Sequence, residues 1–467
     1  MTNKTIAAIA TPLGPGGIGI IRISGPEALG ILKSIFIPQR CDRYTIHPSE
    51  FTFNSHQVYY GHIIDSSENS YIDEVLAIYM RGPKSFTRED VVEIHSHSGF
   101  VVLDRILSIV FDAGATLAQP GEFIKRAFIN GRIDLTQAEA VIDLINAPGE
   151  TALQMASQQI AGGFRKTIED LISKIRSLQA RCEAIIEFEE TENIEQNQQL
   201  KEIQGDIEHT ILMDINKLIK QQQNAAIFRD GIVLAITGIP NVGKSSLLNR
   251  LVQKETAIVS EIPGTTRDII KEYVSINGVP VVLCDTAGIH DSIDPVECLG
   301  IERAQDQIEY ADVVLMVVEA TRNLASFEEK ILARCDPKKT IIVINKDDLN
   351  CGIDMPMIEA SIENFHRIRI SAKFGNGIEQ LRNIIFSILT GDRELNANGT
   401  VTPNLRQRKL LQKAHEELRC SGLGDGVGWE MISETLRNVI LTLEEICGLR
   451  NQEDLYDHIF SQFCIGK

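Results

Sequence analysis

The sequence has no apolar run that reaches the roughly 20 residues needed to cross a bilayer, so no membrane partner is expected. Its start, Met1–Ala10, lacks a basic stretch followed by a long apolar core, which argues against a secretory signal. The 9 cysteines are scattered singly, with neither a C-x-x-C pair nor the spacing of zinc ligands. These absences exclude a disulfide scaffold and indicate buried thiols in a reducing, cytoplasmic environment.

Basic residues are too few to balance the acidic ones. With 46 Lys and Arg against 64 Asp and Glu, the formal net charge of −18 argues against bulk, non-specific attraction to nucleic acid. A nucleic-acid partner would need a local basic patch, and the sequence does not indicate where such a patch lies. The content of 43% hydrophobic and 24% charged residues is typical of a soluble globular protein, and 467 residues imply roughly two to four domains.

The first segment, residues 1–119, combines short β-like runs, separated by Gly and Pro, with a helix-like stretch at Val101–Ala113. This pattern predicts an α+β domain. The β-like runs are Ile18–Ser24, Gln57–Ile64, Glu74–Met80 and Asp90–His95.

Two helical segments, residues 120–224 and 391–467, flank a domain of a different kind. Residues 225–390 alternate helical stretches with near-continuous apolar runs, which are typical of a parallel sheet buried on both faces. We therefore predict a multidomain fold with an α+β N-terminal domain, a discontinuous α-helical domain, and an inserted α/β domain. The apolar runs are Ile232–Thr237, Val279–Asp285, Val313–Val318 and Thr340–Asn345.

A phosphate-binding motif follows the first of these strands. Gly238–Ser245 has the pattern G-x-x-x-x-G-K-S and leads into a helix. Its glycines allow backbone N–H groups to surround phosphates, and the helix N-terminus adds its dipole. We expect Lys244 to contact the β- and γ-phosphates and the Ser245 hydroxyl to bind Mg²⁺.

Four further elements follow in the order of a guanine-nucleotide site. Thr266 is placed to contact Mg²⁺ and the γ-phosphate, and Asp285–Gly288 (DTAG) ends the next strand. Asn345–Asp348 (NKDD) ends a later strand, and its last carboxylate, on Asp348, can accept two hydrogen bonds from guanine that adenine cannot donate. Ser371–Lys373 (SAK) then offers a backbone amide to the guanine O6. This order predicts that the inserted α/β domain is a P-loop G domain and that the chain is a GTP-hydrolysing switch protein.

Two departures from common small GTPases concern catalysis. Ile289 occupies the place where many such enzymes have a Gln that orients the attacking water, and Arg267 is a candidate arginine finger only by proximity. Asn241, inside the phosphate loop, is either a ligand for a monovalent cation or simply a turn residue.

Several motifs resemble the bacterial tRNA-modification GTPase family MnmE, also called TrmE, over essentially the whole length. The matching segments are Ile21–Gly25 (IRISG), Pro120–Phe123 (PGEF) with Arg126–Phe128 (RAF), Gly264–Asp268 (GTTRD), Gly300–Arg303 (GIER) and the terminal Phe463–Lys467 (FCIGK).

The resemblance implies an N-terminal folate-binding domain that forms a homodimer, a split helical domain, and a G domain that meets its copy across the dimer. It also implies Mg²⁺ and K⁺ as cofactors, together with a reduced folate, either 5-formyl- or methylene-tetrahydrofolate. The implied partners are tRNA and the flavoprotein MnmG. The implied reaction adds an aminomethyl or carboxymethylaminomethyl group to carbon 5 of wobble uridine.

Individual roles follow from the same resemblance. Glu297 matches the family's water-activating Glu, which accounts for the apolar Ile289. K⁺ ligands are expected at Asn241, Ser260, Ile262 and Thr265, Mg²⁺ ligands at Ser245 and Thr266, and folate contacts at Arg22, Glu93, Arg132 (Lys in the family) and Lys467. The expected GTP-binding set is Asn241, Val242, Gly243, Lys244, Ser245, Ser246, Ser260, Glu261, Ile262, Pro263, Gly264, Thr265, Thr266, Asp285, Thr286, Ala287, Gly288, Asn345, Lys346, Asp348, Ser371, Ala372 and Lys373.

Other readings of these residues stay open. His95 and His97 have a spacing that suggests metal, although core and rim positions are expected in the absence of a third ligand. Cys464 is a candidate nucleophile, but a buried thiol at a helix end is expected. A switch that times an assembly step, or a folate-dependent methyl transferase with a regulatory G domain, are the alternative functions.

Overall fold

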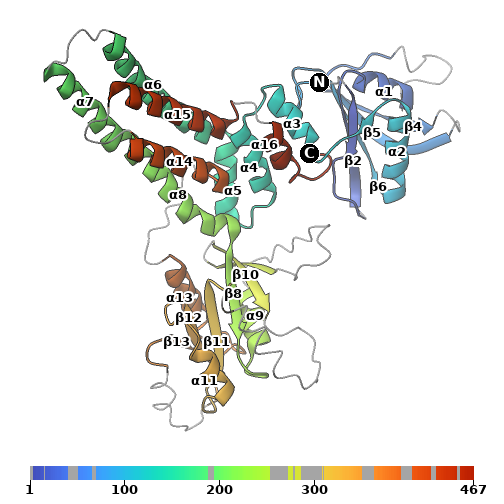
Figure 1. Cartoon of the computed structure of the whole chain (residues 1–467). Helices are drawn as coiled ribbons and strands as arrows, with labels where there is room; N and C mark the ends of the chain where they lie inside the picture. The colour runs from blue at the N-terminus through green and yellow to red at the C-terminus, as the bar shows by residue number, and fades with distance from the viewer. Residues whose placement is uncertain are drawn as a thin grey trace. The chain divides into compact units, whose positions relative to one another are not determined.

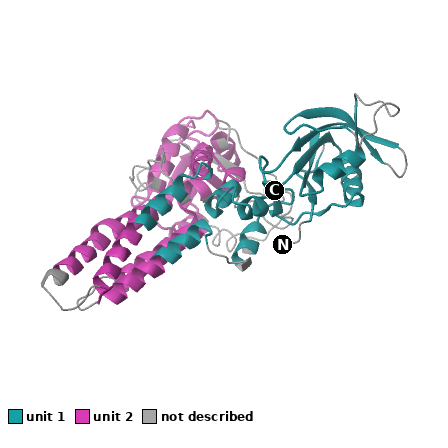
Figure 2. Cartoon of the chain, turned by 90° about the horizontal axis from the view of Figure 1, so that it is seen from above, with its two compact units in different colours: residues 1–142, 160–173, 440–467 teal, residues 143–159, 174–439 magenta. Residues whose placement is uncertain are grey.

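The computed structural model forms two compact units (Figure 2). Residues 1–142, 160–173 and 440–467 make up the first unit, and residues 143–159 and 174–439 the second. Within the described part of the chain, none of the helices is both long and apolar enough to span a membrane. The described residues are 4–14, 16–39, 51–65, 70–187, 194–252, 272–276, 279–285, 308, 310–349, 362–390, 402–421, 428–449 and 453–467.

The first unit is built on a seven-stranded sheet with the order β3-β4-β5-β6-β2-β1-β7. Its strand pairs are antiparallel except for β1 with β7, which are parallel. Helices α1 (Ala28–Ile35) and α2 (Phe100–Asp112) pack on one face through a shared apolar core, so the expected α+β domain is confirmed. The strands are β1 (Ile6–Ile9), β2 (Gly16–Ser24), β3 (Phe36–Pro38), β4 (Val58–Asp65), β5 (Ser70–Met80), β6 (Val91–Ser98) and β7 (Thr116–Leu117).

The opposite face of this sheet carries a row of three apolar side chains and one histidine in register. Tyr60, Leu76, His95 and Ile20 lie directly opposite one another across β4, β5, β6 and β2. Tyr60 and Leu76 are each 40% exposed. Because residues on one pleated face share one environment, this row marks an apolar surface that the described elements leave open.

The C-terminal end of the chain packs within the same unit. Aromatic residues of α16 (Glu453–Phe460) form an apolar cluster with α3 (Glu122–Ile129) and the start of α4 (Leu135–Ile145). The apolar run Ile459–Ile465 predicts that Phe460, Phe463 and Ile465 dock against the protein. Phe460 and Phe463 are 2% and 6% exposed, which confirms this for both. Ile465 is 50% exposed, so its expected docking is wrong, because the apolar cluster ends at Phe463.

Long helices dominate the first part of the second unit. Helices α8 and α14 lie side by side (Figure 1). Asn216 of α8 forms a hydrogen bond of 2.9 Å with His415 of α14, and Arg408 of α14 donates to Gln222 of α8 at 3.0 Å. Helices on either side of residues 225–390 are therefore neighbours. The helices are α5 (Glu150–Ile160), α6 (Gly163–Glu187), α7 (Ile194–Asp206), a π-helical turn (Ile207–Ile211), α8 (Leu212–Asp230), α14 (Leu405–Ser421) and α15 (Trp429–Cys447). Of these, Ile160, residues 163–173 of α6 and residues 440–447 of α15 belong to the first unit.

A six-stranded sheet with the order β13-β12-β11-β8-β10-β9 forms the rest of the second unit. All its strand pairs are parallel except β9 with β10. Apolar clusters cover both faces, as the near-continuous apolar runs predict. The elements are β8 (Ile232–Thr237), α9 (Lys244–Val252), β9 (Glu272–Ile276), β10 (Val279–Asp285), β11 (Val313–Glu319), α11 (Ser326–Leu332), β12 (Thr340–Asn345), β13 (His366–Arg369) and α13 (Ile378–Thr390).

Candidate functional site

The phosphate loop joins β8 to α9 by a backbone path that requires glycine. Gly238 has φ 146°, and a Cβ there would lie 2.4 Å from the Val317 carbonyl oxygen. Gly243 has φ 98°, and its Cβ would lie 2.2 Å from the Asn345 side-chain nitrogen. Both positions therefore exclude a side chain, which keeps the loop backbone open for phosphate oxygens.

Lys244 begins α9, and its side chain turns back over the loop. Its Nζ donates hydrogen bonds of 2.8 Å to the Gly238 carbonyl and 2.9 Å to the Ile239 carbonyl. Ser245 and Ser246 are exposed in the first turn of the helix, whereas Val242 is buried in the core. The Lys244 ammonium over the loop and the exposed Ser245 hydroxyl at the start of α9 are groups that fit a phosphate with Mg²⁺.

The guanine motif is tied to the phosphate loop by Asn345. This side chain is 2% exposed, donates to the Val242 carbonyl at 2.8 Å, and accepts from the Ala372 amide at 3.0 Å. The Ser371 hydroxyl donates to Asp348 Oδ1 at 2.6 Å. Asn345 thereby links three motifs that are far apart in sequence, and Ser371 orients the carboxylate expected to bind guanine.

Two charged residues that the sequence did not single out support this arrangement. Glu319, at the end of β11, accepts from Thr321 at 2.6 Å and pairs with Lys346 at 2.9 Å. The hydrogen bond from Thr321, followed by that from Lys346, lowers the pKa of Glu319. Arg250 donates to the carbonyls of Ala372 and Lys373 at 3.0 and 2.6 Å. Glu319 is the last residue of an apolar strand, as Asn345 is, and this position is the sequence feature that could have identified it as a site residue.

Most of the catalytic and cation-binding predictions lie outside the described residues. Asp285 ends β10 opposite Ile236, at the same edge of the sheet as the phosphate loop. Asn241 adopts φ 64° within that loop. The predicted residues outside the described part are Ser260, Glu261, Ile262, Pro263, Gly264, Thr265, Thr266, Thr286, Ala287, Gly288 and Glu297.

A second candidate site lies in the first unit, on the open face of the N-terminal sheet. The Arg22 Nε pairs with Glu93 Oε1 at 2.8 Å, and its NH1 donates to the Gly466 carbonyl at 3.2 Å. The Arg22 guanidinium also lies 5.7 Å from the centre of the Phe123 ring. The structure thus brings two predicted folate residues together with the C-terminal residues of the chain.

Phe86 connects Arg22 to the third predicted folate residue. The guanidinium carbons of Arg22 and Arg132 lie 5.8 and 4.8 Å from the centre of the Phe86 ring. Arg132 also donates to the Phe86 carbonyl at 2.9 Å. Burial and the nearby charge of Arg88 lower the pKa of Arg132. Lys467, half-buried at the end of the chain, directly follows the glycine that accepts from Arg22.

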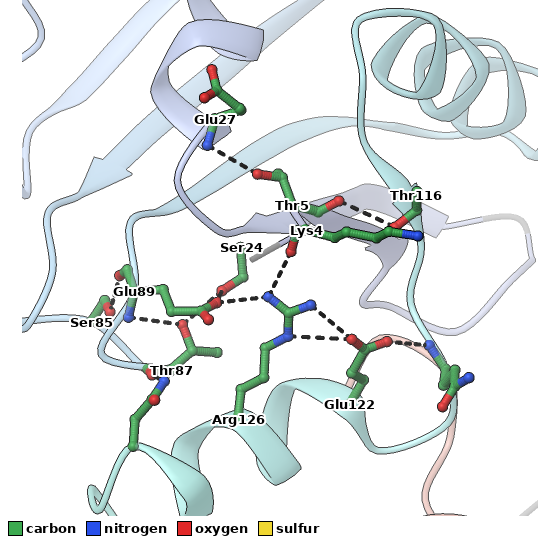
Figure 3. A network of polar contacts seen from close by, with 12 residues as sticks. Lys4, Thr5, Ser24, Glu27, Ser85, Thr87, Glu89, Thr116, Glu122 and Arg126 are labelled. Carbon is green, nitrogen blue, oxygen red and sulfur yellow. Dashed lines mark hydrogen bonds and ion pairs between the residues drawn. The ribbon is translucent and has the colours of Figure 1, made fainter. Parts of the chain in front are cut away.

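A polar network holds the loop that carries Phe86 (Figure 3). The Arg126 guanidinium, on α3, donates to Glu89 at 3.0 Å, to Glu122 at 2.8 Å and to the Lys4 carbonyl at 2.9 Å. Glu89 also accepts from the Ser24 hydroxyl at 2.7 Å. Because these groups are largely shielded from water, the network fixes the loop against both the sheet and α3.

The histidines and the terminal cysteine have distinct surroundings. His95 Nε2 lies 3.4 Å from Glu93, whereas His97 Nδ1 lies 2.8 Å from Asp73, and the hydrogen bond to Asp73 raises the pKa of His97. No group of three metal-binding side chains occurs in the described part of the chain. Cys464 is exposed, so its expected burial is wrong. The chain has already left α16 at this residue, and it is the Cys464 carbonyl, not the thiol, that accepts a hydrogen bond from the Gly121 amide.

A cavity of about 40 Å³ lies in the second unit, away from the nucleotide motifs. The Asp143–Arg229 ion pair of 2.7 Å borders it. Such a volume holds about one or two waters and is too small for a nucleotide. The remaining lining residues are Asn146, Pro148, Ala152, Met155, Ala156 and Thr402.

Comparison with known proteins gives consistent matches along the chain. Residues 5–132 match the family model described as the GTP-binding protein TrmE N-terminus, and residues 135–464 match the MnmE helical domain. The tRNA modification GTPase MnmE of Carboxydothermus hydrogenoformans is 40% identical over 100% of both chains. That of Desulfotalea psychrophila is 41% identical over 100% of this chain and 98% of its own length. A solved structure of Aquifex aeolicus Era is 28% identical over 40% of this chain and 67% of its own, with a TM-score of 0.27.

Proposed function

The chain belongs to the MnmE family of tRNA modification GTPases, and from this premise we propose that it is a K⁺-dependent enzyme that modifies wobble uridine in certain tRNAs. The chain is a GTP hydrolase. In the proposed reaction it acts with the flavoprotein MnmG to add an aminomethyl or carboxymethylaminomethyl group to carbon 5 of the uridine at position 34. A reduced folate supplies the methylene carbon.

The observation that carries the proposal is the cluster of contacts that joins Arg22, Glu93, Arg132 and the chain end. A switch that only bound GTP would not need a second site with paired charges and aromatic walls. Glu93 offers a carboxylate that can accept from the ring nitrogens of a pteridine, and Phe86 offers a stacking surface. Arg132 provides a cation for the carboxylates of the folate, and Arg22 holds Glu93 in place. These residues therefore fit a folate.

In the G domain, the chain's own groups bind and orient GTP. Lys244 and the start of α9 neutralise phosphate charge, and Asp348, held by Ser371, selects guanine. Mg²⁺ on Ser245 and Thr266 would neutralise charge that develops on the phosphates. Asn241, with Ser260, Ile262 and Thr265, would hold K⁺ and replace an arginine finger. Glu297 would orient the attacking water.

We further propose a homodimer through the N-terminal domain. Tyr60 and Leu76 are large apolar residues that a monomer would leave in water, and their row ends beside the Arg22–Glu93 pair. Burial of such a surface against a second copy is favourable at about 25 cal/mol per Å². A dimer formed there would place the two folate pockets close to the shared interface.

Mass spectrometry of tRNA from a strain that lacks the protein tests the proposal. We expect the wobble uridine of some tRNAs to lack the aminomethyl or carboxymethylaminomethyl group, and we expect the full-length gene to restore it. An Arg22→Ala variant should fail to restore it while still hydrolysing GTP. Unchanged wobble uridines would instead favour a GTPase that times an assembly step.

A further inference from the structure

Arg88 occupies a backbone conformation that favours glycine. Its φ is 60°, and among the described non-glycine residues positive φ occurs elsewhere only at His56, Asn241 and Lys346. Asn241 and Lys346 both belong to nucleotide-binding motifs. A non-glycine residue in this region is held there at a cost by its surroundings, and such positions cluster at functional sites. The Arg88 side chain is therefore the feature to explain.

The Arg88 and Arg132 side chains interlock two segments of the chain. Arg88 donates to the Asn130 carbonyl at 2.9 Å, and Arg132 donates to the Phe86 carbonyl at 2.9 Å. Asn130 in turn donates to the Thr87 carbonyl at 2.6 Å. Both guanidinium groups thus lie where the segment of Phe86–Arg88 meets that of Asn130–Arg132. Each guanidinium has five N–H donors, and its contact with a carbonyl uses one of them. Donors remain for an external acceptor.

Two other arginines of the domain, Arg22 and Arg126, have carboxylate partners. Arg22 pairs with Glu93, and Arg126 pairs with Glu89 and Glu122. Within the described residues, no carboxylate contacts Arg88 or Arg132, although the chain has a formal charge of −18. The charge of Arg88 also contributes to the lowered pKa of Arg132, which indicates that the two cations are close. Two such cations in proximity favour an anion.

The position of the pair indicates which anion. Arg132 shares the Phe86 ring with Arg22, which itself pairs with Glu93, so the Arg88–Arg132 pair adjoins the candidate folate residues. A folate has an aromatic end and a glutamate end, and glutamyl units added to it through the γ-carboxyl each contribute one more carboxylate. Planar guanidinium groups bind carboxylates with two parallel hydrogen bonds.

We propose that Arg88, together with Arg132, binds the glutamyl carboxylates of the folate and makes this protein prefer polyglutamylated folates over the monoglutamate. The inference rests on the proposed folate site and adds a specificity-determining residue to it. If Arg88 served only to join its loop to Asn130, a hydrogen-bond donor without charge would serve equally well. The positive charge is what the proposed role requires.

The test measures binding of 5-formyltetrahydrofolate with one and with three glutamates to the full-length protein by calorimetry. We expect the triglutamate to bind about tenfold more tightly, as for one charge-assisted contact. Arg88→Gly should abolish this preference, and Arg88→Lys should largely retain it. Lys84→Ala removes an exposed cation from the same loop and should leave the preference intact. Glycine suits φ 60°, so the melting temperature of Arg88→Gly should not fall.

The possible outcomes separate the inference from the function on which it rests. If the parent protein binds neither folate, the proposed folate site fails and the inference with it. If the parent binds both folates equally, or if Arg88→Gly keeps the preference, the inference alone is overturned. If Arg88→Gly weakens binding of tRNA while the folate preference persists, the pair contacts RNA phosphates, and the inference is overturned as well.

Discussion

Replacement of Gly466 by alanine tests whether the chain end forms part of the folate pocket. Gly466 has φ 96°, and a Cβ there would lie 2.2 Å from the Ile9 carbonyl oxygen and 2.9 Å from the Ala10 Cα. The backbone at Ile9 is held by the pairing of β1 with β2, in which Ile9 lies opposite Ile21 and the Ala10 amide donates to the Ile20 carbonyl at 2.7 Å. The chain end must therefore shift instead.

The magnitude follows from the contacts that the shift removes. A non-glycine residue at such a φ costs about 1–3 kcal/mol, and the lost hydrogen bond from the Arg22 guanidinium to the Gly466 carbonyl contributes about 1.5–3 kcal/mol. Phe463, 6% exposed, should stay docked, so only the last residues detach. Since 1.4 kcal/mol corresponds to a factor of ten, we expect folate affinity to fall about 10–100-fold.

The assay is calorimetric titration of 5-formyltetrahydrofolate, with GTP turnover measured in parallel and expected to be unchanged. Gly114→Ala is the matched control, because Gly114 has φ 109° in the same unit but has no atom within 4 Å of an added Cβ. Gly114→Ala therefore introduces the backbone strain of a positive φ without a steric clash of the new Cβ. Deletion of Cys464–Lys467 should likewise weaken folate binding and abolish tRNA modification while GTP hydrolysis continues. Equal folate affinity of Gly466→Ala and Gly114→Ala would refute this reasoning.

Three predictions concern the G domain. GTP turnover should be about 10²-fold faster in K⁺ than in Na⁺, and Asn241→Ala should remove the difference; equal rates of the parent in both salts would contradict the cation site. Glu297→Ala should lower kcat about 10²–10⁴-fold with little change in GTP affinity, and turnover within a factor of about two of the parent would show an ordinary surface carboxylate. Asp348→Asn should weaken GTP binding by up to about 10⁴-fold in calorimetry, because the amide presents a donor to guanine donors; unchanged affinity would exclude the assignment.

The nucleotide site was largely predictable from the sequence because its parts are short and local. The strands Ile232–Thr237 and Thr340–Asn345 have the predicted bounds, since continuous apolar runs of this length favour strands buried on both faces. The helix after the phosphate loop was also predicted, although it begins at Lys244 and not, as expected, at Ser246. The edge strand His366–Arg369 was missed, because three of its four residues are exposed and polar and carry no apolar signal.

The supporting contacts of both sites depended on the fold. Nothing near Glu319 in the sequence indicates its pairing with Lys346, 27 residues away. The role of Asn345 as a link between Val242 and Ala372 also needs the parallel sheet that brings their loops to one edge. The exposure of Cys464 was mispredicted because an apolar run predicts burial on average and does not say where the helix ends.

The sequence by itself determined that this protein binds a nucleotide at a P-loop, because a phosphate loop needs only consecutive residues with the right backbone freedom. It also determined the apolar strands around that loop. Only the tertiary structure decided that Arg22 meets the carbonyl of Gly466, 444 residues later in the chain. The physical reason is that such a contact depends on how an apolar helix docks against a sheet built from the opposite end of the chain, and local preference carries no information about that docking.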